Sequence, residues 1–349
     1  MKLSEITGGR ENNLDVIRFC AAVLVILCHA FPISLGEGHV DILGRLTEDQ
    51  IHFGNLAVCI FFFYGGFLIC KSAERLQEAV PYFKARILRI IPCLAVVTFV
   101  LAFVAGPILT ELSPGDYFTN PGTFRYLLNS VMVLVHNLPG VFQENIYNPT
   151  VNGPLWTLPV EFLCYIMCFL ALKLHFVNEK NARWMILMFA AGYLGAVKVL
   201  AGSQVLSAAL RPVGLFFAGM VYYIYREKII IRPWLAGVCG VLLAAAAAVH
   251  LLEPVIFFCF PYLMAWLGFG TRHKCSGFAR RGEVSYGMYL CGWPIQQIIC
   301  QAFGGQMNPY LNAALTVPLA VLCGFLLNRL VEQPLGRRFA RQPEKKRQK

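Results

Sequence analysis

The sequence predicts an all-α protein, a polytopic membrane bundle of about ten transmembrane helices with both termini in the cytoplasm. Of its 349 residues, 57% are hydrophobic and only 14% are charged, whereas a soluble globular chain carries about 25% charged residues. The apolar residues gather in runs of about 20, the length that a helix needs to cross the hydrocarbon core. Since backbone groups in lipid must be hydrogen-bonded within the protein, such runs are expected to be helices.

Ten apolar runs are expected to span the membrane. Their approximate ranges are 14–34, 52–71, 90–110, 155–174, 184–200, 204–225, 234–252, 254–270, 284–303 and 309–330. The run at 204–225 contains Arg211 followed by Pro212, so we expect it to kink or to begin late. The first run follows about thirteen polar residues and has no cleavage site after it. It is interpreted as a retained helix rather than a signal peptide.

The basic residues predict the orientation of these helices, because Lys and Arg are enriched in cytoplasmic loops. With the N-terminus inside, 26 of the 30 basic residues fall in inner segments. This topology explains the net charge of +11, so nucleic-acid binding is not expected. We expect a multi-pass protein of a bacterial-type plasma (inner) membrane. Residues 1–338 would form the membrane domain and residues 339–349 a basic cytoplasmic tail.

Two segments outside the spans are expected to carry structure of their own. The segment 72–89 is expected to form an amphipathic helix on the inner surface, broken at Pro81. The segment 111–153 is the longest outer loop, with a helical stretch near 123–137 followed by a polar run. Most of the thirteen cysteines lie in apolar runs and show no CxxC or zinc-ligand spacing. Neither disulfides nor metal binding are therefore expected.

Ionisable residues inside the spans are costly and are therefore candidates for function. His29 lies eleven residues after Arg18, which places both on one face of a helix about 16 Å apart. Glu161 lies about six residues into the fourth run, and it could reach the depth of His29. A carboxylate there would orient the imidazole and stabilise its protonated form. The alternatives are a snorkelling anchor for Arg18 and ordinary structural contacts for His29 and Glu161.

Two further patterns indicate either a ligand or packing. Arg86 and Arg89 share one helix face, and such a pair suits phosphate recognition, although ordinary inner-surface charge is the alternative. Gly65 and Gly66 lie within the aromatic run 60–70. Small residues there allow either close helix packing or a slot for a slender ligand.

Six motifs, in order from residue 14 to residue 338, resemble those of the integral-membrane acyltransferase family 3. They are Arg–ten residues–His at Arg18 and His29, the aromatic–glycine run at 60–69, Arg-x-x-Arg-x-x-Pro at Arg86, Arg89 and Pro92, Trp–Glu at Trp156 and Glu161, the ninth-span motif at 285–297, and Glu-x-Pro within 329–338. Two positions depart from the pattern: Gly65 replaces a frequent serine and Gly292 replaces a frequent histidine. The fused extracytoplasmic domain of some members is not found in this sequence, so transfer is expected to be completed within the membrane domain.

The resemblance implies transfer of an acyl group, most often acetyl, from cytoplasmic acyl-CoA to a hydroxyl of a carbohydrate or glycoconjugate. His29 would be the general base and Glu161 would hold it, and an acyl-enzyme route through His29 is ranked lower. Of the other predicted site residues, three are expected to bind the donor (Arg18, Arg86 and Arg89). Four are expected either to line the substrate channel or to have a structural role (Tyr64, Trp156, Tyr286 and Tyr289). Acyl-CoA, most simply acetyl-CoA, is expected as a co-substrate, with no permanently bound cofactor or metal. The other expected partners are the lipid bilayer and a carbohydrate or lipid-linked sugar.

Two other classes of function compete with this interpretation. A proton-coupled secondary transporter of a small polar solute would also use buried His, Arg and Glu. Such transporters often have two related halves, and the sequence shows no such repeat. A non-catalytic scaffold would leave His29 and Glu161 unexplained. The acceptor, the length of the acyl group and the oligomeric state stay open.

Overall fold

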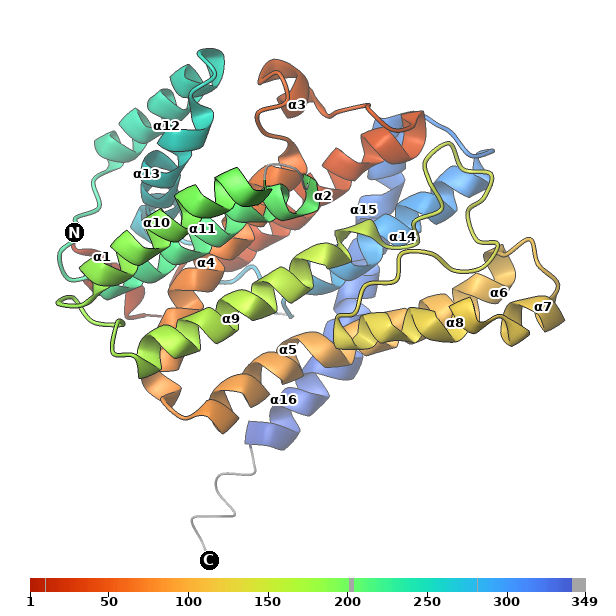
Figure 1. Ribbon diagram of the computed structural model, residues 1–349, viewed down its shortest axis with the longest axis horizontal. Coiled ribbons are helices and arrows are strands. Elements are labelled where there is room, and N and C mark those ends of the chain that lie inside the picture. The colour runs from red at the N-terminus through yellow and green to blue at the C-terminus, as the bar shows by residue number, and fades with distance from the viewer. Residues whose placement is uncertain (10, 201–203, 281, 341–349) are drawn as a thin grey trace, which may run out of the picture. The chain divides into compact units, whose positions relative to one another are not determined.

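The computed structural model describes residues 1–9, 11–200, 204–280 and 282–340, and the regular structure of these residues is helical, without strands (Figure 1). Six helical segments in this part of the chain are long and apolar enough to cross a membrane. They are Leu14–Leu35, Phe53–Leu76, Ala79–Leu109, Gly153–Lys173, Leu252–Gly270 and Pro309–Arg337. An all-helical protein with several membrane spans is thus confirmed. The number of ten spans and the orientation stay predictions, and the predicted tail lies outside the described residues from 341 onward.

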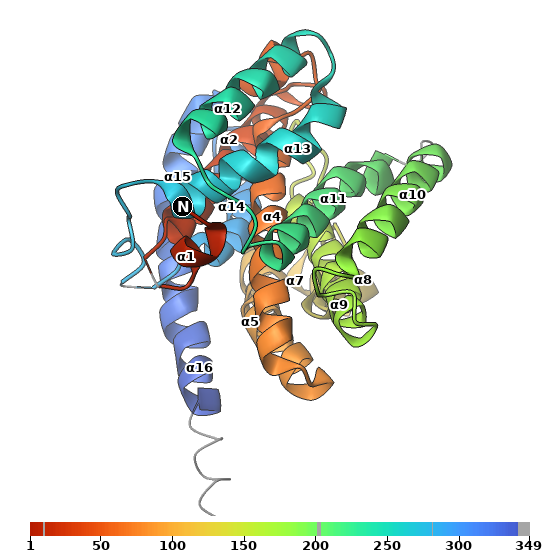
Figure 2. The same cartoon turned by 90° about the vertical axis from the view of Figure 1, so that its left-hand side faces the viewer.

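The chain divides into two compact units, and the first comprises residues 1–21, 42–82 and 157–278. Its helices are α1 (Leu3–Thr7), the start of α2 (Leu14–Leu35), α3 (Ile42–Leu46), α4 (Phe53–Leu76), α9 (Thr157–Lys173), α10 (Ala182–Leu200), α11 (Gln204–Ile224), α12 (Pro233–Ala248) and α13 (Leu252–Ala265), with a π-helical turn at Trp266–Gly270. The helix α4 packs most extensively on α11 and also on α9. Figure 2 shows α10 beside α11 and α12 beside α13.

Glycines bring α4 and α11 together backbone to backbone. A Cβ atom at Gly66 would lie 1.9 Å from the carbonyl oxygen of Phe216, and one at Gly219 would lie 2.1 Å from the carbonyl oxygen of Phe63. No side chain fits in such gaps, so the structure favours packing over a ligand slot at Gly66. At Gly65 a Cβ atom would make an ordinary 3.7 Å contact with the ring of Phe216. A side chain as small as serine would fit there.

The second unit comprises residues 22–41, 83–156 and 279 onward. It holds most of α2, most of α5 (Ala79–Val100) with a π-helical turn at Leu101–Ala105, α6 (Gly106–Leu109), α7 (Pro114–Thr119), α8 (Pro121–Arg125), 3-10 turns at Tyr126–Val131 and Gly153–Trp156, α14 (Ser285–Ala302), α15 (Pro309–Leu327), a π-helical turn at Asn328–Glu332, and α16 (Gln333–Ala340). The helices α14 and α15 pack closely, since a Cβ atom at Gly287 would lie 2.4 Å from the Cα atom of Gly324. This pair carries one side of the candidate site.

The predicted amphipathic helix over 72–89 is wrong as a separate element. The helix α4 continues to Leu76, the chain turns at Gln77 with a φ of 53°, and α5 begins at Ala79 and runs on into the third span. Pro81 lies in the first turn of α5, where a missing N–H costs nothing. It therefore does not break the helix. The predicted helical stretch near 123–137 is also shorter than expected, because the 3-10 turn after α8 ends before Met132, which has a left-handed φ of 65°.

Candidate functional site

His29 lies against a buried tryptophan of the same unit. It is half-buried in α2, and its ring meets Trp293 of α14 edge to face, with centroids 4.8 Å apart and planes at 69°. The indole Nε1 of Trp293 donates to the carbonyl oxygen of Thr150 at 2.9 Å, and Tyr147 packs on the same indole at 5.4 Å. The imidazole is thereby placed beside a tryptophan that the loop 143–153 holds in position.

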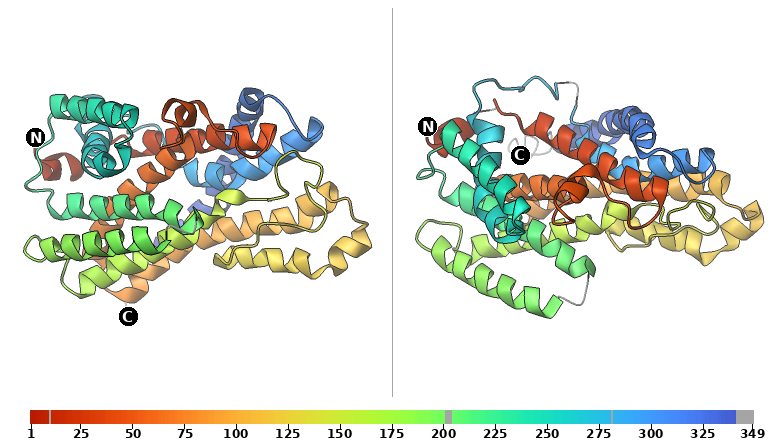
Figure 3. Two further views of the ribbon diagram at one scale, coloured as in Figure 1. Left: turned by 45° about the horizontal axis from the view of Figure 1, so that its top comes forward. Right: turned by 90° about the horizontal axis from the view of Figure 1, so that it is seen from above.

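The polar end of that loop runs beside α14 (Figure 3). Amide side chains bond the two together. The Nδ2 of Asn145 donates to the backbone oxygen of Gln297 at 3.0 Å and to its Oε1 at 2.9 Å. In return, the Nε2 of Gln297 donates to the carbonyl oxygens of Asn148 and Thr150 at 3.2 and 3.1 Å. The segment 145–150 is therefore bonded to α14 through both side-chain and backbone groups.

The final residues of the loop are fixed in the same way. Asn152 Nδ2 donates to the carbonyl oxygen of Leu290 at 2.9 Å, and the hydroxyl of Tyr289 donates to that of Pro154. A Cβ atom at Gly153 would lie 2.9 Å from the Trp293 ring. Only glycine therefore lets the loop approach the indole this closely.

Gly292, one of the two departures from the family pattern, lies in α14 where that helix meets α2. A Cβ atom there would lie 3.0 Å from Cγ1 of Ile26, so α2 approaches α14 closely at this point. A larger side chain would need the two helices to separate by part of an ångström.

Tyr147, whose ring packs on Trp293, has a phenol with a shifted pKa. The pKa of Tyr147 is raised by its burial first and by the Glu37 carboxylate second. The phenol therefore stays protonated at neutral pH and keeps both a donor and an acceptor for hydrogen bonds. The Oε1 of Glu37 accepts a hydrogen bond from Asn148 Nδ2 at 3.0 Å, which places one negative charge at the edge of the docked loop.

The structure adds a carboxylate that the sequence interpretation missed. Asp41 lies just after α2 in the same unit, is fully buried, and interacts electrostatically with His29. The signal was present as an acidic residue shortly after the first apolar run. Glu161 belongs to the other unit, where it accepts a hydrogen bond from the hydroxyl of Tyr165. Its pairing with His29 stays a prediction, and Asp41 is a second candidate for that role.

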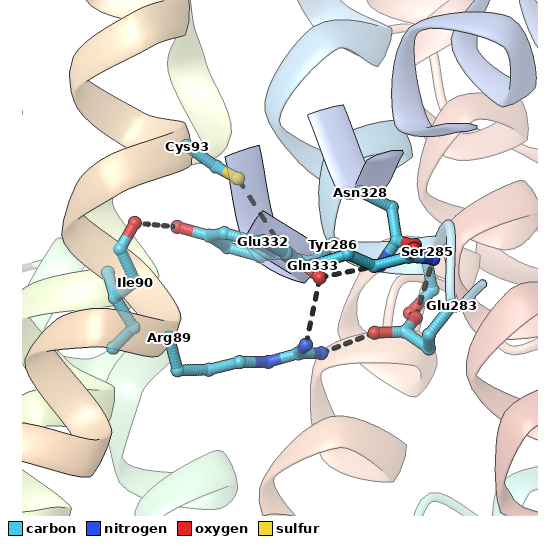
Figure 4. A network of polar contacts seen from close by, with 9 residues as sticks. All are labelled: Arg89, Ile90, Cys93, Glu283, Ser285, Tyr286, Asn328, Glu332 and Gln333. Atoms are coloured by element: carbon cyan, nitrogen blue, oxygen red, sulfur yellow. Dashed lines mark hydrogen bonds and ion pairs between the residues drawn. The ribbon is translucent and has the colours of Figure 1, made fainter. Parts of the chain in front are cut away.

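Arg89 is held between two carboxylates (Figure 4). One guanidinium nitrogen pairs with Glu283, just before α14, and the other with Glu332, in the turn after α15, at 3.2 Å. The sequence interpretation did not foresee that the Arg-x-x-Arg and Glu-x-Pro elements are partners. A donor phosphate would have to compete with these carboxylates for Arg89. Arg86 lies one turn earlier and half-buried, and its role in donor binding stays a prediction.

Further bonds surround this ion-paired arginine. Glu283 accepts from the hydroxyl of Ser285, and Glu332 accepts from Asn328 Nδ2 at 2.8 Å and from the thiol of Cys93 at 3.8 Å. The hydroxyl of Tyr286 donates to the carbonyl oxygen of Ile90 at 2.9 Å. This Arg89 network ties α5 to the start of α14 and to the end of α15.

The remaining predicted residues occupy mostly structural positions. Tyr64 is fully buried and donates to the carbonyl oxygen of Met264 at 2.7 Å. Like Tyr286 and Tyr289, it uses its hydroxyl on a backbone oxygen, which supports the structural alternative over a channel lining. Arg18 is half-buried in α2 and interacts electrostatically with Tyr64, and Trp156 is half-buried at the end of its turn.

The chain matches the family model described as an acyltransferase domain over residues 11–329. It is 27% identical over 335 residues to an O-acetyl transferase of Shigella phage Sf6, covering 93% of this chain and 96% of that protein. It is also 27% identical over 319 residues to nodulation protein 10 of Rhizobium leguminosarum bv. viciae, covering 82% of this chain and 83% of the relative. An acyltransferase, MdmB, of Streptomyces mycarofaciens is 24% identical over 382 residues, covering 94% and 93%. No solved structure matches the chain.

Proposed function

Because the chain belongs to this acyltransferase family, we propose that it transfers an acetyl group from cytoplasmic acetyl-CoA to a hydroxyl of a carbohydrate or glycoconjugate. The sequence-based prediction of an acyltransferase is confirmed, and the enzyme is built on several apolar helices of membrane-spanning length. The O-acetyl transferase among its relatives supports both acetyl as the group and oxygen as its acceptor. The observation that carries the proposal is the half-buried imidazole of His29, which contacts the fixed indole of Trp293 and interacts electrostatically with the buried carboxylate of Asp41.

In the proposed reaction, His29 carries one proton from the acceptor hydroxyl to the leaving thiolate. The imidazole takes the proton of the acceptor hydroxyl while the oxygen attacks the thioester carbonyl carbon, and the carbon–sulfur bond then breaks. The imidazolium returns the proton to the leaving thiolate, so that an ester and free CoA thiol are formed. A positioned base of this kind contributes about 10²- to 10⁴-fold to the rate. A buried carboxylate stabilises the imidazolium between the two steps.

Donor binding rests on charge and length. The nucleotide end of CoA is strongly anionic and suits Arg86 and Arg18, since guanidinium groups recognise phosphate well. The extended pantetheine arm is about 15–20 Å long on covalent geometry, and Arg18 and His29 are about 16 Å apart along α2. The thioester would therefore reach His29 while the nucleotide stays on the cytoplasmic side.

The test is donor chemistry with purified protein in nanodiscs. We expect acetyl-CoA to release CoA thiol in the presence of sugar acceptors, and His29→Ala to lower that rate about 100-fold or more without changing protein yield. Full activity in His29→Ala would remove the proposed base. If the wild type neither releases thiol nor is stabilised by acetyl-CoA, the donor is wrong, and proton-coupled transport becomes the next assay.

A further inference from the structure

Three buried amide side chains near His29 each have an oxygen without a hydrogen-bond partner among the described residues. They are Oδ1 of Asn145, Oδ1 of Asn152 and Oε1 of Gln296, on side chains that are 7%, 2% and 0% exposed. Buried polar atoms without partners are rare in native proteins, and each is costly. In an apolar membrane domain the cost is greater, because no bulk water is near. These oxygens therefore indicate a place where hydrogen-bond donors enter.

The partners of the amide nitrogens fix which atom is left over. Asn145 donates to the backbone oxygen of Gln297, Asn152 donates to that of Leu290, and Gln296 donates to that of Ile26 at 2.8 Å. Turning any of these amides over would set an oxygen against a carbonyl oxygen. The free groups are consequently all acceptors, and their ligand must supply hydroxyl or N–H donors.

Helix geometry places these amides around the contact between His29 and Trp293. Leu290, Trp293 and Gln297 recur at helical spacing on one face of α14. At 1.5 Å per residue, the two loop anchors lie about 4.5 Å before and about 6 Å after Trp293 along the axis. Asn152 and Asn145 thus flank the indole. Gln296 bonds to Ile26, which precedes His29 by about one turn of α2.

The chemistry of this group is that of a site for neutral polyhydroxylated molecules. Amide oxygens accept from ring hydroxyls, and the apolar face of a sugar ring packs on aromatic rings such as Trp293 and Tyr147. The carboxylate of Glu37 is bonded to this loop, and its negative charge disfavours an anionic acceptor. We infer that the loop 143–153 and the adjoining face of α14 bind a neutral sugar residue of the acceptor, with Asn145, Asn152 and Gln296 receiving its hydroxyls. This inference rests on the proposed function, because it takes His29 as the point of transfer.

A stability measurement separates a ligand-binding amide from a structural one. Replacing an amide that has an unpaired oxygen removes a buried cost, so Gln296→Met should leave thermal stability unchanged or raise it. Asn312 is the matched control, because it is also fully buried but uses both ends of its amide. Its Nδ2 donates to the Gln296 carbonyl at 3.1 Å, and its Oδ1 accepts from Thr316 at 3.4 Å. Asn312→Leu should lower stability and leave the acceptor KM within about twofold.

The test measures transfer of radiolabelled acetyl from acetyl-CoA to neutral glycosides and to aliphatic alcohols of similar size in nanodiscs. We expect the wild type to prefer the glycosides. Gln296→Met and Asn152→Leu should each raise the glycoside KM about 3- to 10-fold, the worth of one hydrogen bond, with the acetyl-CoA affinity unchanged. If Asn152→Leu does not fold, Gln296→Met decides the question.

Two results would overturn the inference. One is a preference for aliphatic alcohols, and the other is an unchanged glycoside KM in a folded Gln296→Met enzyme, which would mean that ordered water alone meets these oxygens. Either result together with transfer that still requires His29 defeats the acceptor site and leaves the proposed function standing. Absence of transfer by the wild type to every acceptor defeats both.

Discussion

Two polar networks of the second unit differ in how completely their hydrogen-bonding groups are used. In the Arg89 network the guanidinium has two carboxylates, and those carboxylates have further donors. In the amide network of Asn145, Asn152 and Gln296, the nitrogens are bonded and the oxygens are left without partners among the described residues. A saturated network holds helices together, whereas an unsaturated one has capacity for a ligand. The first would fail as a loss of stability, the second as a loss of substrate affinity.

The largest stability effect is expected in the saturated network. Arg89→Ala leaves Glu283 and Glu332 facing each other without a cation. Breaking a fully buried ion pair costs about 3–5 kcal/mol. Because the Arg89 side chain is 45% exposed, we expect about 1–3 kcal/mol here. The measurement is the unfolding temperature in detergent. The double variant Arg89→Ala with Glu332→Gln should recover part of the stability that Arg89→Ala loses. If the unfolding temperature is unchanged while the acetyl-CoA KM rises steeply, Arg89 is a phosphate ligand and the comparison fails.

The next largest effect is expected at Asp41, the buried carboxylate that interacts electrostatically with His29. Asp41→Asn keeps the size of a fully buried side chain and removes its charge, so the imidazolium loses its stabilising partner. We expect kcat to fall about 10- to 100-fold with both KM values nearly constant. Glu161→Gln is the matched variant. A normal kcat in Asp41→Asn and a large loss in Glu161→Gln would return the role to Glu161.

The interface of α4 with α11 offers a test of packing alone, because its glycines bring the two backbones into close contact. Gly66→Ala would put a methyl group 1.9 Å from the Phe216 carbonyl oxygen, so the helices must separate at a cost of about 1–3 kcal/mol. Gly65→Ala meets only a 3.7 Å contact and should change the free energy of unfolding by less than about 0.5 kcal/mol. Chemical unfolding of the two variants side by side measures this difference. Equal losses of unfolding free energy would show that the close contact between α4 and α11 does not lie at Gly66.

Local pattern predicted the helices well and their partners poorly. Apolar runs found the membrane-length helices because bilayer thickness acts on each segment separately. Pro81 misled because its effect depends on whether it lies in the first turn of a helix or in its interior. Where Pro81 falls depends on where α4 ends and α5 begins. The turn at Gln77, with its positive φ, sets that boundary. Boundaries of this kind are not visible in hydropathy.

The site shows the same division. The spacing of Arg18 and His29 and the proximity of Arg86 to Arg89 are local and could be read directly. The partners of Arg89 lie 194 and 243 residues away in sequence. The amides that bond the loop 143–153 to α14 lie about 140–150 residues from their partners. No local pattern encodes such pairings. Asp41 is an intermediate case, an acidic residue close to the first span whose burial only the fold reveals.

The most direct measurement compares Gln296→Met and Arg89→Ala on the same preparations, recording unfolding temperature and glycoside KM for each. We expect Arg89→Ala to lower the unfolding temperature and keep the glycoside KM. We expect Gln296→Met to raise the KM and to leave the unfolding temperature unchanged or higher. If both variants shift both quantities alike, the two networks do not differ in function. The division between a structural Arg89 network and an acceptor site is then contradicted.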